Sequence, residues 1–145
     1  MNTQVFTNEE IDVALELIDH ALNNQNQKDY QIYTYKENKK LIGYYCIGPT
    51  PLTSGTFDLY WIAVEPNSHN RGIGKMLLKH AEDMVKSQGG RLIIAETSSR
   101  PKYEKTRKFY LSNKYEELAR IKDYYQIDDD LVIYGKYVSQ PGVLK

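Results

Sequence analysis

The chain is poor in the features that mark secreted and membrane-embedded proteins. Its 145 residues contain one cysteine, so no internal disulfide can form, and a reducing cytoplasm is the location that we expect. No apolar run approaches the ~20 residues that a membrane span needs. The first residues also lack the basic and then apolar pattern of a signal peptide. We therefore expect a cytoplasmic protein without a membrane partner, formed by one domain over residues 1–145.

An excess of either charge is also missing, since 19 Lys and Arg residues balance 19 Asp and Glu residues. A general nucleic-acid binder needs a basic excess to neutralise phosphates, so no nucleic-acid partner is expected. The three histidines, His20, His69 and His80, do not have the spacing of metal ligands, so no metal site is expected. Cys46 lies within an apolar segment, where a structural thiol is far more common than a nucleophile.

The sequence does contain a strand that leads through a short loop into a glycine-rich helix start. Residues 57–64 are mostly apolar, aromatic or β-branched and predict the central strand, which ends at Pro66. After residues 71–75, apolar side chains recur with the 3.6-residue period of a helix. Gly89 and Gly90 predict the C-terminal end of that helix.

Such a junction is suited to binding an anion. The first N–H groups of a helix have no intrahelical partner, and the helix dipole places partial positive charge beside them. Gly72 and Gly74 let a phosphate approach the backbone closely, while Arg71 and Lys75 add full positive charges. The alternative interpretation is a plain helix N-terminus with two spacer glycines.

Two better-known phosphate loops do not match this segment. A Walker loop needs Ser or Thr after the Gly-Lys pair to hold magnesium, and Met76 stands there. A dinucleotide-binding fingerprint needs Gly or Ala three residues after Gly74, and that residue is Leu77. ATP hydrolysis and NAD binding are therefore disfavoured.

The rest of the chain alternates helix and strand patterns. A capping box formed by Thr7 and Glu10 predicts a first helix over residues 7–23. The other predicted elements are strands at 30–35 and 41–47 around a hairpin turn at 37–40, a strand at 91–95, a turn at 96–101, a helix at 102–111, strands at 115–121 and 131–138 around a loop at 123–130, and a frayed tail at 139–145. This order indicates an α/β layer with a mixed sheet.

The segment from Val64 to Gly74 resembles the acetyl-CoA-binding motif of the GNAT N-acetyltransferase superfamily. That motif is usually Arg/Gln-x-x-Gly-x-Gly/Ala, and here His69 takes its first place. Residues 106–110 and 114–115 fall where the family has its last conserved helix and the strand that follows it, and the resemblance covers residues 41–138. It implies a GNAT-like mixed, mostly antiparallel sheet, splayed at the central strand and flanked by helices, with a β-α-β-α-β-β core.

The resemblance also implies acetyl-CoA as the cofactor, held in the split of the sheet. Its pantetheine arm would pair with the exposed backbone of the central strand, and its pyrophosphate would lie at the helix start, beside the last helix. The residues implied to bind it are Ile62, Ala63, Val64, His69, Asn70, Arg71, Gly72, Ile73, Gly74, Lys75, Thr106 and Phe109.

Direct transfer to an amine needs an acid for the departing thiolate, and Tyr110 matches the tyrosine that the family uses. A core tyrosine on an amphipathic helix is the alternative. The amine must also lose a proton, because only about 0.1% of a primary ammonium is neutral at pH 7. Asp58 on the central strand is the first candidate base, or else a solvent-facing strand residue. Glu96, at the end of the next parallel strand, is the second, or else a partner of Arg100 or Lys102.

These residues predict an acetyl-CoA-dependent N-acetyltransferase that acts on a primary amine of a small molecule. A protein N-terminus or lysine, and a non-catalytic acyl-CoA-binding module, are the alternatives. The acidic run at residues 128–130 fits a solvated hairpin turn, or a surface that attracts a cationic acceptor. The closing strands could also pair across a homodimer.

Overall fold

The computed structural model describes residues 29–68 and 71–139, so the predicted helix at 7–23 and most of the predicted tail lie outside the described residues. The described chain forms six strands and two α-helices, with short 3₁₀ turns before each helix. In chain order they are β1 (Gln31–Glu37), β2 (Lys40–Pro49), β3 (Thr56–Val64), α2 (Ile73–Ser87), β4 (Leu92–Ser98), α3 (Glu104–Ser112), β5 (Glu116–Gln126) and β6 (Asp129–Tyr137). No helix within these ranges is long and apolar enough to cross a membrane.

All six strands belong to one sheet in the order β1-β2-β3-β4-β6-β5. Neighbouring strands are antiparallel except for β3 and β4, which are parallel and joined by the crossover helix α2. The sheet is therefore mixed and mostly antiparallel, which confirms the predicted fold class.

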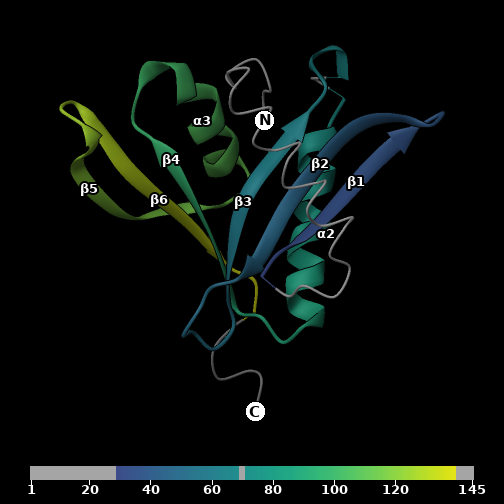
Figure 1. Ribbon diagram of the computed structural model, residues 1–145, viewed down its shortest axis with the longest axis horizontal. Coiled ribbons are helices and arrows are strands. Elements are labelled where there is room, and N and C mark those ends of the chain that lie inside the picture. Colours follow the sequence, from purple (N-terminus) through teal and green to yellow (C-terminus); the bar gives the residue numbers. More distant parts are fainter. Residues whose placement is uncertain (1–28, 69–70, 140–145) are drawn as a thin grey trace.

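The central feature of the sheet is a split between β3 and β4. The two strands pair over only three positions, Thr56–Leu92, Phe57–Ile93 and Asp58–Ile94. Beyond these pairs, β3 continues to Val64 along β2, and β4 continues to Ser98 along β6. Figure 1 shows the result as two arms that meet at the lower end of β3 and β4 and diverge above it. The predicted splay at the central strand is confirmed.

The closed end of the split is fixed by the turn that follows α2. Gly89 has a φ of 78°, the left-handed conformation expected where a glycine ends a helix. The backbone of Gly90 lies so close to Phe57 that a Cβ at Gly90 would approach the Phe57 ring to 2.9 Å. The Arg91 N–H then donates to the Gly55 carbonyl at 2.7 Å. These contacts hold the first residues of β4 against the first residues of β3.

Every strand is longer than the sequence pattern predicts, and the differences that bear on the site lie in β4, β5 and β6. The predicted strand at 91–95 continues to Ser98, because each residue up to Ser98 has an antiparallel partner on β6. The predicted loop at 123–130 is wrong: β5 extends to Gln126, β6 begins at Asp129, and the turn is confined to residues 127–128. The register between β5 and β6 is irregular: the residues between Ile121 and Gln126 on β5 lie opposite a single residue of β6, Asp130. Polar residues on an exposed edge strand produce a pattern that resembles a loop.

The hydrophobic core lies between the sheet and the two helices. Helix α2 packs on β2 and β3, and its buried apolar face comprises Ile73, Leu77, Leu78, Ala81 and Val85. On the other arm, α3 places Tyr110 in a stack on Tyr134 of β6, with ring centroids 5.9 Å apart, and beside Tyr115, 5.5 Å away. Each arm of the sheet therefore has its own helix, as seen in Figure 1.

A buried ionic contact links α2 to the opposite arm. Glu82 is only 7% exposed, and its carboxylate accepts hydrogen bonds from the Tyr115 hydroxyl at 3.1 Å and the Lys136 ammonium at 3.0 Å. Lys136 lies on β6 and also donates to the Asn113 carbonyl. Because β3 and β4 share only three pairs, this contact is a second connection between the two arms.

We expect Glu82→Ala to lower the free energy of unfolding by about 3 kcal/mol, because it leaves a buried hydroxyl and a partly buried ammonium without their acceptor. The matched control is Asp83→Ala on the same helix, whose exposed pair with Lys79 is worth less than about 1 kcal/mol. Urea unfolding of both variants measures the difference. Equal, small losses would show that Glu82 does not hold the arms together.

Candidate active site

A cavity of about 360 Å³ occupies the split between β3 and β4. Its walls come from both arms of the sheet, from α3 with the turn before it, and from the β5–β6 hairpin. The lining residues are Tyr60, Trp61, Ile62, Glu96, Thr97, Ser98, Arg100, Lys102, Tyr103, Thr106, Tyr110, Tyr125 and Asp129. Both predicted catalytic residues on the second arm, Glu96 and Tyr110, are thus brought together in one cavity.

The cavity is reached by side chains from both faces of the sheet. On β4, Ala95 and Thr97 are buried while Glu96 between them is exposed, so Glu96 points away from the face that the helices cover. Thr106 and Tyr110 enter from α3, on the helical face. Two ligands bound on opposite faces could therefore meet in the split.

A bulge in β3 shapes the first arm of the cavity. Trp61 pairs with Cys46, and Leu59 pairs with Ile47, so Tyr60 is an extra residue without a partner on β2. In a regular strand, neighbouring side chains point to opposite faces. Here three consecutive residues, Tyr60, Trp61 and Ile62, all line the cavity, and the bulge accounts for this.

Tyr110 is 5% exposed and lies in the aromatic stack with Tyr115 and Tyr134. Within the described residues its hydroxyl has no hydrogen-bond partner. Burial raises the pKa of this phenol well above its ordinary value of 10. The group therefore keeps its proton at neutral pH and can give it to a ligand in the cavity.

Thr106 provides an independent sign that the cavity takes a polar ligand. The residue is 7% exposed, lines the cavity, and its Oγ1 is buried without any hydrogen-bond partner in the described structure. A buried hydroxyl without a partner costs about 1–3 kcal/mol. Such groups are rare in native structures and are often satisfied by a ligand or an ordered water.

The two candidate bases occupy different places. Glu96 lines the cavity, and its carboxylate has no ion pair or hydrogen bond within residues 29–68 and 71–139. Burial is the main cause of the raised pKa of the Tyr60 and Tyr125 phenols; the charge of Glu96 adds to the rise at Tyr125, and at Tyr60 it adds after that of Asp58. Asp58 lies at the closed end of the split, paired with Gly48 and Ile94, and does not line the cavity.

The start of α2 keeps the features expected of an anion site. Gly72 has a φ of 75°, and a Cβ there would meet no atom of the described residues within 4 Å, so that part of the chain leaves the backbone open to a ligand. The helix has no acidic residue in its first turn and no side-chain cap, which leaves its dipole uncompensated. Among the described residues, Lys75 has no carboxylate within ion-pair distance.

Arg71 has a structural partner that the sequence did not reveal. Its guanidinium forms two hydrogen bonds with Glu37 of β1, at 2.6 and 3.0 Å, and holds the pKa of that carboxyl below its usual range. This pair attaches the loop before α2 to the β1–β2 hairpin. Much of the positive charge expected from Arg71 is therefore already compensated.

The remaining predicted cofactor residues divide between the cavity and its surroundings. Ile62 lines the cavity, whereas Ala63 and Val64 are buried further along β3. Phe109 packs on the core with its ring edge towards Tyr110 and does not line the cavity. His69 and Asn70 lie outside the described residues.

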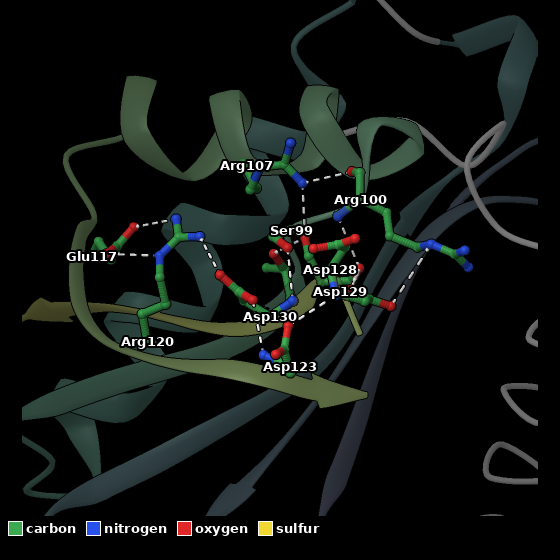
Figure 2. Close-up of polar contacts among 11 residues, drawn as sticks. Ser99, Arg100, Arg107, Glu117, Arg120, Asp123, Asp128, Asp129 and Asp130 are labelled. Atoms are coloured by element: carbon green, nitrogen blue, oxygen red, sulfur yellow. Dashed lines mark hydrogen bonds and ion pairs between the residues drawn. The ribbon is translucent and has the colours of Figure 1, made fainter. Parts of the chain in front are cut away.

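The β5–β6 hairpin supplies residues that the sequence analysis did not place in the site. Figure 2 shows how polar contacts hold it: Arg107 donates to the carbonyls of Ser98 and Arg100, and Arg120 pairs with Asp130. Of the acidic run, Asp128 lies in the turn, Asp130 is engaged by Arg120, and Asp129 is buried in the cavity wall. The run is therefore not a uniformly solvated turn.

Tyr60, Trp61 and Tyr125 are three more lining residues that the sequence analysis did not place in the site. The bulge in β3 brings Tyr60 and Trp61 into the cavity wall, and Tyr125 lies in the segment of β5 whose register is irregular. The sequence signal available was the clustering of tyrosines near an acidic run, which does not by itself predict a site.

A model of the acetyltransferase (GNAT) family matches residues 3–113. The chain belongs to the GNAT acetyltransferase family. A structure from Desulfovibrio desulfuricans, assigned in its description to the acetyltransferases of the GNAT family, is 43% identical with a TM-score of 0.89. The match covers 95% of this chain and 87% of that one. Among curated proteins, no sequence matches this chain.

More distant solved structures share the fold. An aminoglycoside 6'-N-acetyltransferase in complex with coenzyme A is 17% identical, with a TM-score of 0.70 over 84% of this chain and 79% of that one. The ribosomal-protein-S18-alanine N-acetyltransferase from Escherichia coli is also 17% identical, with a TM-score of 0.70 over 95% and 94% of the two chains. GNAT family members use acetyl-CoA or CoA.

We expect Thr106→Val to raise the free energy of unfolding of the ligand-free protein by about 1 kcal/mol, because it replaces a buried hydroxyl without a partner by a methyl group of the same size. Thermal and urea unfolding measure the change. Thr97→Val is the matched control, since the Thr97 hydroxyl donates to the Ser98 carbonyl and its loss should destabilise. A destabilised Thr106→Val would mean that Oγ1 has a partner in the free protein.

Proposed function

We propose that this chain transfers an acetyl group from acetyl-CoA directly to the primary amine of a small molecule. One observation supports this most strongly: Glu96 and Tyr110, a carboxylate and a protonated phenol, reach the same cavity from opposite faces of the split sheet. A base on one side and an acid on the other are what amine acetylation requires.

Several features of the described chain fit a CoA thioester on the helical face. Between Leu59 and Ala63, the edge of β3 that faces β4 has no ladder pairing with a described strand, which suits an extended amide-containing arm. The orphaned Thr106 hydroxyl offers a polar contact, and Gly72 with Lys75 offers a place for the pyrophosphate. When bound there, acetyl-CoA supplies an acetyl group activated as a thioester.

Tyr110 acts as the acid. Because burial raises the pKa of its phenol, the hydroxyl carries a proton at neutral pH. The stack with Tyr134 and Tyr115 fixes the ring, so the hydroxyl is held in the cavity and can protonate a departing thiolate.

Glu96 acts as the base that accepts the proton of the incoming ammonium, directly or through a water. Its carboxylate has no partner among the described residues and lies on the face of the sheet opposite the helices. Asp58, the first choice from the sequence, lies at the closed end of the split, where it does not reach the cavity wall.

The size of the cavity supports a small acceptor. About 360 Å³ lies near the lower end of the range for small-molecule sites. A protein N-terminus or a lysine side chain is the alternative acceptor within the same chemistry, and turnover of peptides but not of small amines would favour it.

We expect Tyr110→Phe to lower kcat by about 100-fold or more with little change in KM, because the phenol acts only when the thiolate departs. Thiol release from acetyl-CoA, measured with a panel of amines and peptides, gives both constants. Tyr134→Phe is the matched control, since Tyr134 shares the stack but does not line the cavity. With the raised pKa of Tyr110, kcat should not decline up to about pH 10. Equal activity of the two variants would remove Tyr110 from the chemistry.

A second comparison of variants distinguishes Glu96 from Asp58 as the base. We expect Glu96→Gln to lower kcat/KM at pH 7 by about 50-fold, with recovery towards higher pH as more of the amine becomes neutral by itself. Asp58→Asn should change kcat/KM by less than about fivefold. Measurements of both variants from about pH 7 to pH 10 decide between them, and the opposite order would make Asp58 the base.

A further inference from the structure

A second carboxylate lines the same cavity as Glu96. Asp129 is 6% exposed, and its Oδ1 accepts a hydrogen bond from the Ser98 hydroxyl. The nearest cation is Arg100, whose Nε lies 3.9 Å from Oδ2, which is beyond hydrogen-bond distance, and whose side chain is half exposed. Figure 2 shows Arg100 and Asp129 at the edge of the polar network of the hairpin.

For a buried carboxylate, Asp129 has little compensation of its negative charge. Removing a carboxylate from water is costly unless hydrogen bonds and a close cation replace the water. Here one hydroxyl donates to it, and Arg107, the other arginine nearby, donates instead to backbone carbonyls. Lys102, the remaining cation of the lining, lies 5.0 Å from the centre of the Tyr103 ring. A cationic ligand group would complete the compensation of Asp129.

The two carboxylates lie on the same face of the sheet, and the strand positions that lead to them are two residues apart. Glu96 and Ser98 are two residues apart on β4, so their side chains point to the same side, roughly 7 Å apart along the strand. Since Ser98 donates to Asp129, the carboxylate of Asp129 lies one hydrogen bond from that position. About four methylene groups between two nitrogens span such a distance.

The walls around the carboxylates suit an organic cation with an aliphatic stem. Tyr60, Trp61 and Tyr125 line the cavity, and both Glu96 and Asp129 contribute, after burial, to the raised pKa of the Tyr125 phenol. Aromatic faces attract ammonium groups and pack on methylenes.

We propose that the acceptor is a diamine or polyamine: Glu96 receives the amine that is acetylated, and Asp129 binds a second ammonium group of the same molecule. This inference rests on the proposed function and specifies its substrate class. Asp129 is then a residue that determines specificity and takes no part in the proton transfers.

Three amines with the same four-carbon chain test the proposal with saturating acetyl-CoA and the full chain: 1,4-diaminobutane, 4-amino-1-butanol and 1-aminobutane. We expect kcat/KM for the diamine to exceed that for either monoamine by about 20-fold or more, well above the statistical factor of two for its two amines. Added salt should reduce this preference, because it screens the second charge pair.

Asp129→Asn should abolish the preference by raising KM for the diamine about tenfold or more, while kcat/KM for the two monoamines falls by much less. Asp128→Asn, a neighbouring turn residue with a φ of 65° that asparagine tolerates, is the matched control and should keep the preference. If Asp129→Asn impairs all three amines alike, Asp129 is only a partner of Ser98 and Arg100, and the proposal is wrong.

The wild-type comparison stands without any variant, so a failure of Asp129→Asn to fold does not prevent the test. Equal kcat/KM for the diamine and the monoamines would overturn the inference and leave the proposed function intact. An absence of thiol release with every amine and peptide, despite bound CoA, would instead overturn the proposed function itself.

Discussion

The short contact between β3 and β4 is the constraint on which the rest of the structure depends. Three residue pairs hold the strands together, and each strand is otherwise bound to its outer neighbour, β2 or β6. A parallel pair with a helical crossover normally continues along the full strand length, and the backbone groups of both strands are then satisfied by each other. Here the ladder stops at Asp58, and the facing strand edges become the walls of a cavity. The turn at Gly90 and the buried Glu82 contact keep the closed end closed.

An opening through a sheet allows two reactants to approach from different sides. The helical face has an uncapped helix start at Gly72, an orphaned Thr106 hydroxyl and a phenol that burial keeps protonated. The opposite face has aromatic walls and the two carboxylates Glu96 and Asp129. The electrostatic character therefore changes across the sheet, from groups suited to an anionic donor to groups suited to a cationic acceptor. This division is the physical basis for assigning donor and acceptor to separate faces.

The elements that depend on local sequence patterns were predicted from the sequence. The central strand, both described helices and the β1–β2 hairpin follow from periodicity and turn residues, and the mixed sheet follows from their order. The splay was implied only by family resemblance. It arises because β3 and β4 stop pairing after Asp58, and no local sequence pattern marks that point. The length of β4, the bulge at Tyr60 and the irregular register of β5 depend on partners far away in the sequence. For this reason the sequence analysis ended the strand before Glu96, although it named Glu96 as a candidate base, and left the run at residues 128–130 as either a solvated turn or a surface that attracts a cationic acceptor. The roles of His69 and Asn70 remain predictions.

The central claim is that the unpaired edge of β3 within the split is the place where the acyl donor binds. Residue-resolved hydrogen exchange of the backbone amides from Tyr60 to Ala63, with and without saturating CoA, tests it most directly. We predict that at least one of these amides exchanges about tenfold or more slowly with CoA, because an extended ligand arm accepts its hydrogen bond. Amides at the closed end, at Phe57 and Ile93, should change little. Unchanged exchange along β3, with CoA bound elsewhere, would contradict the assignment of the split as the donor site.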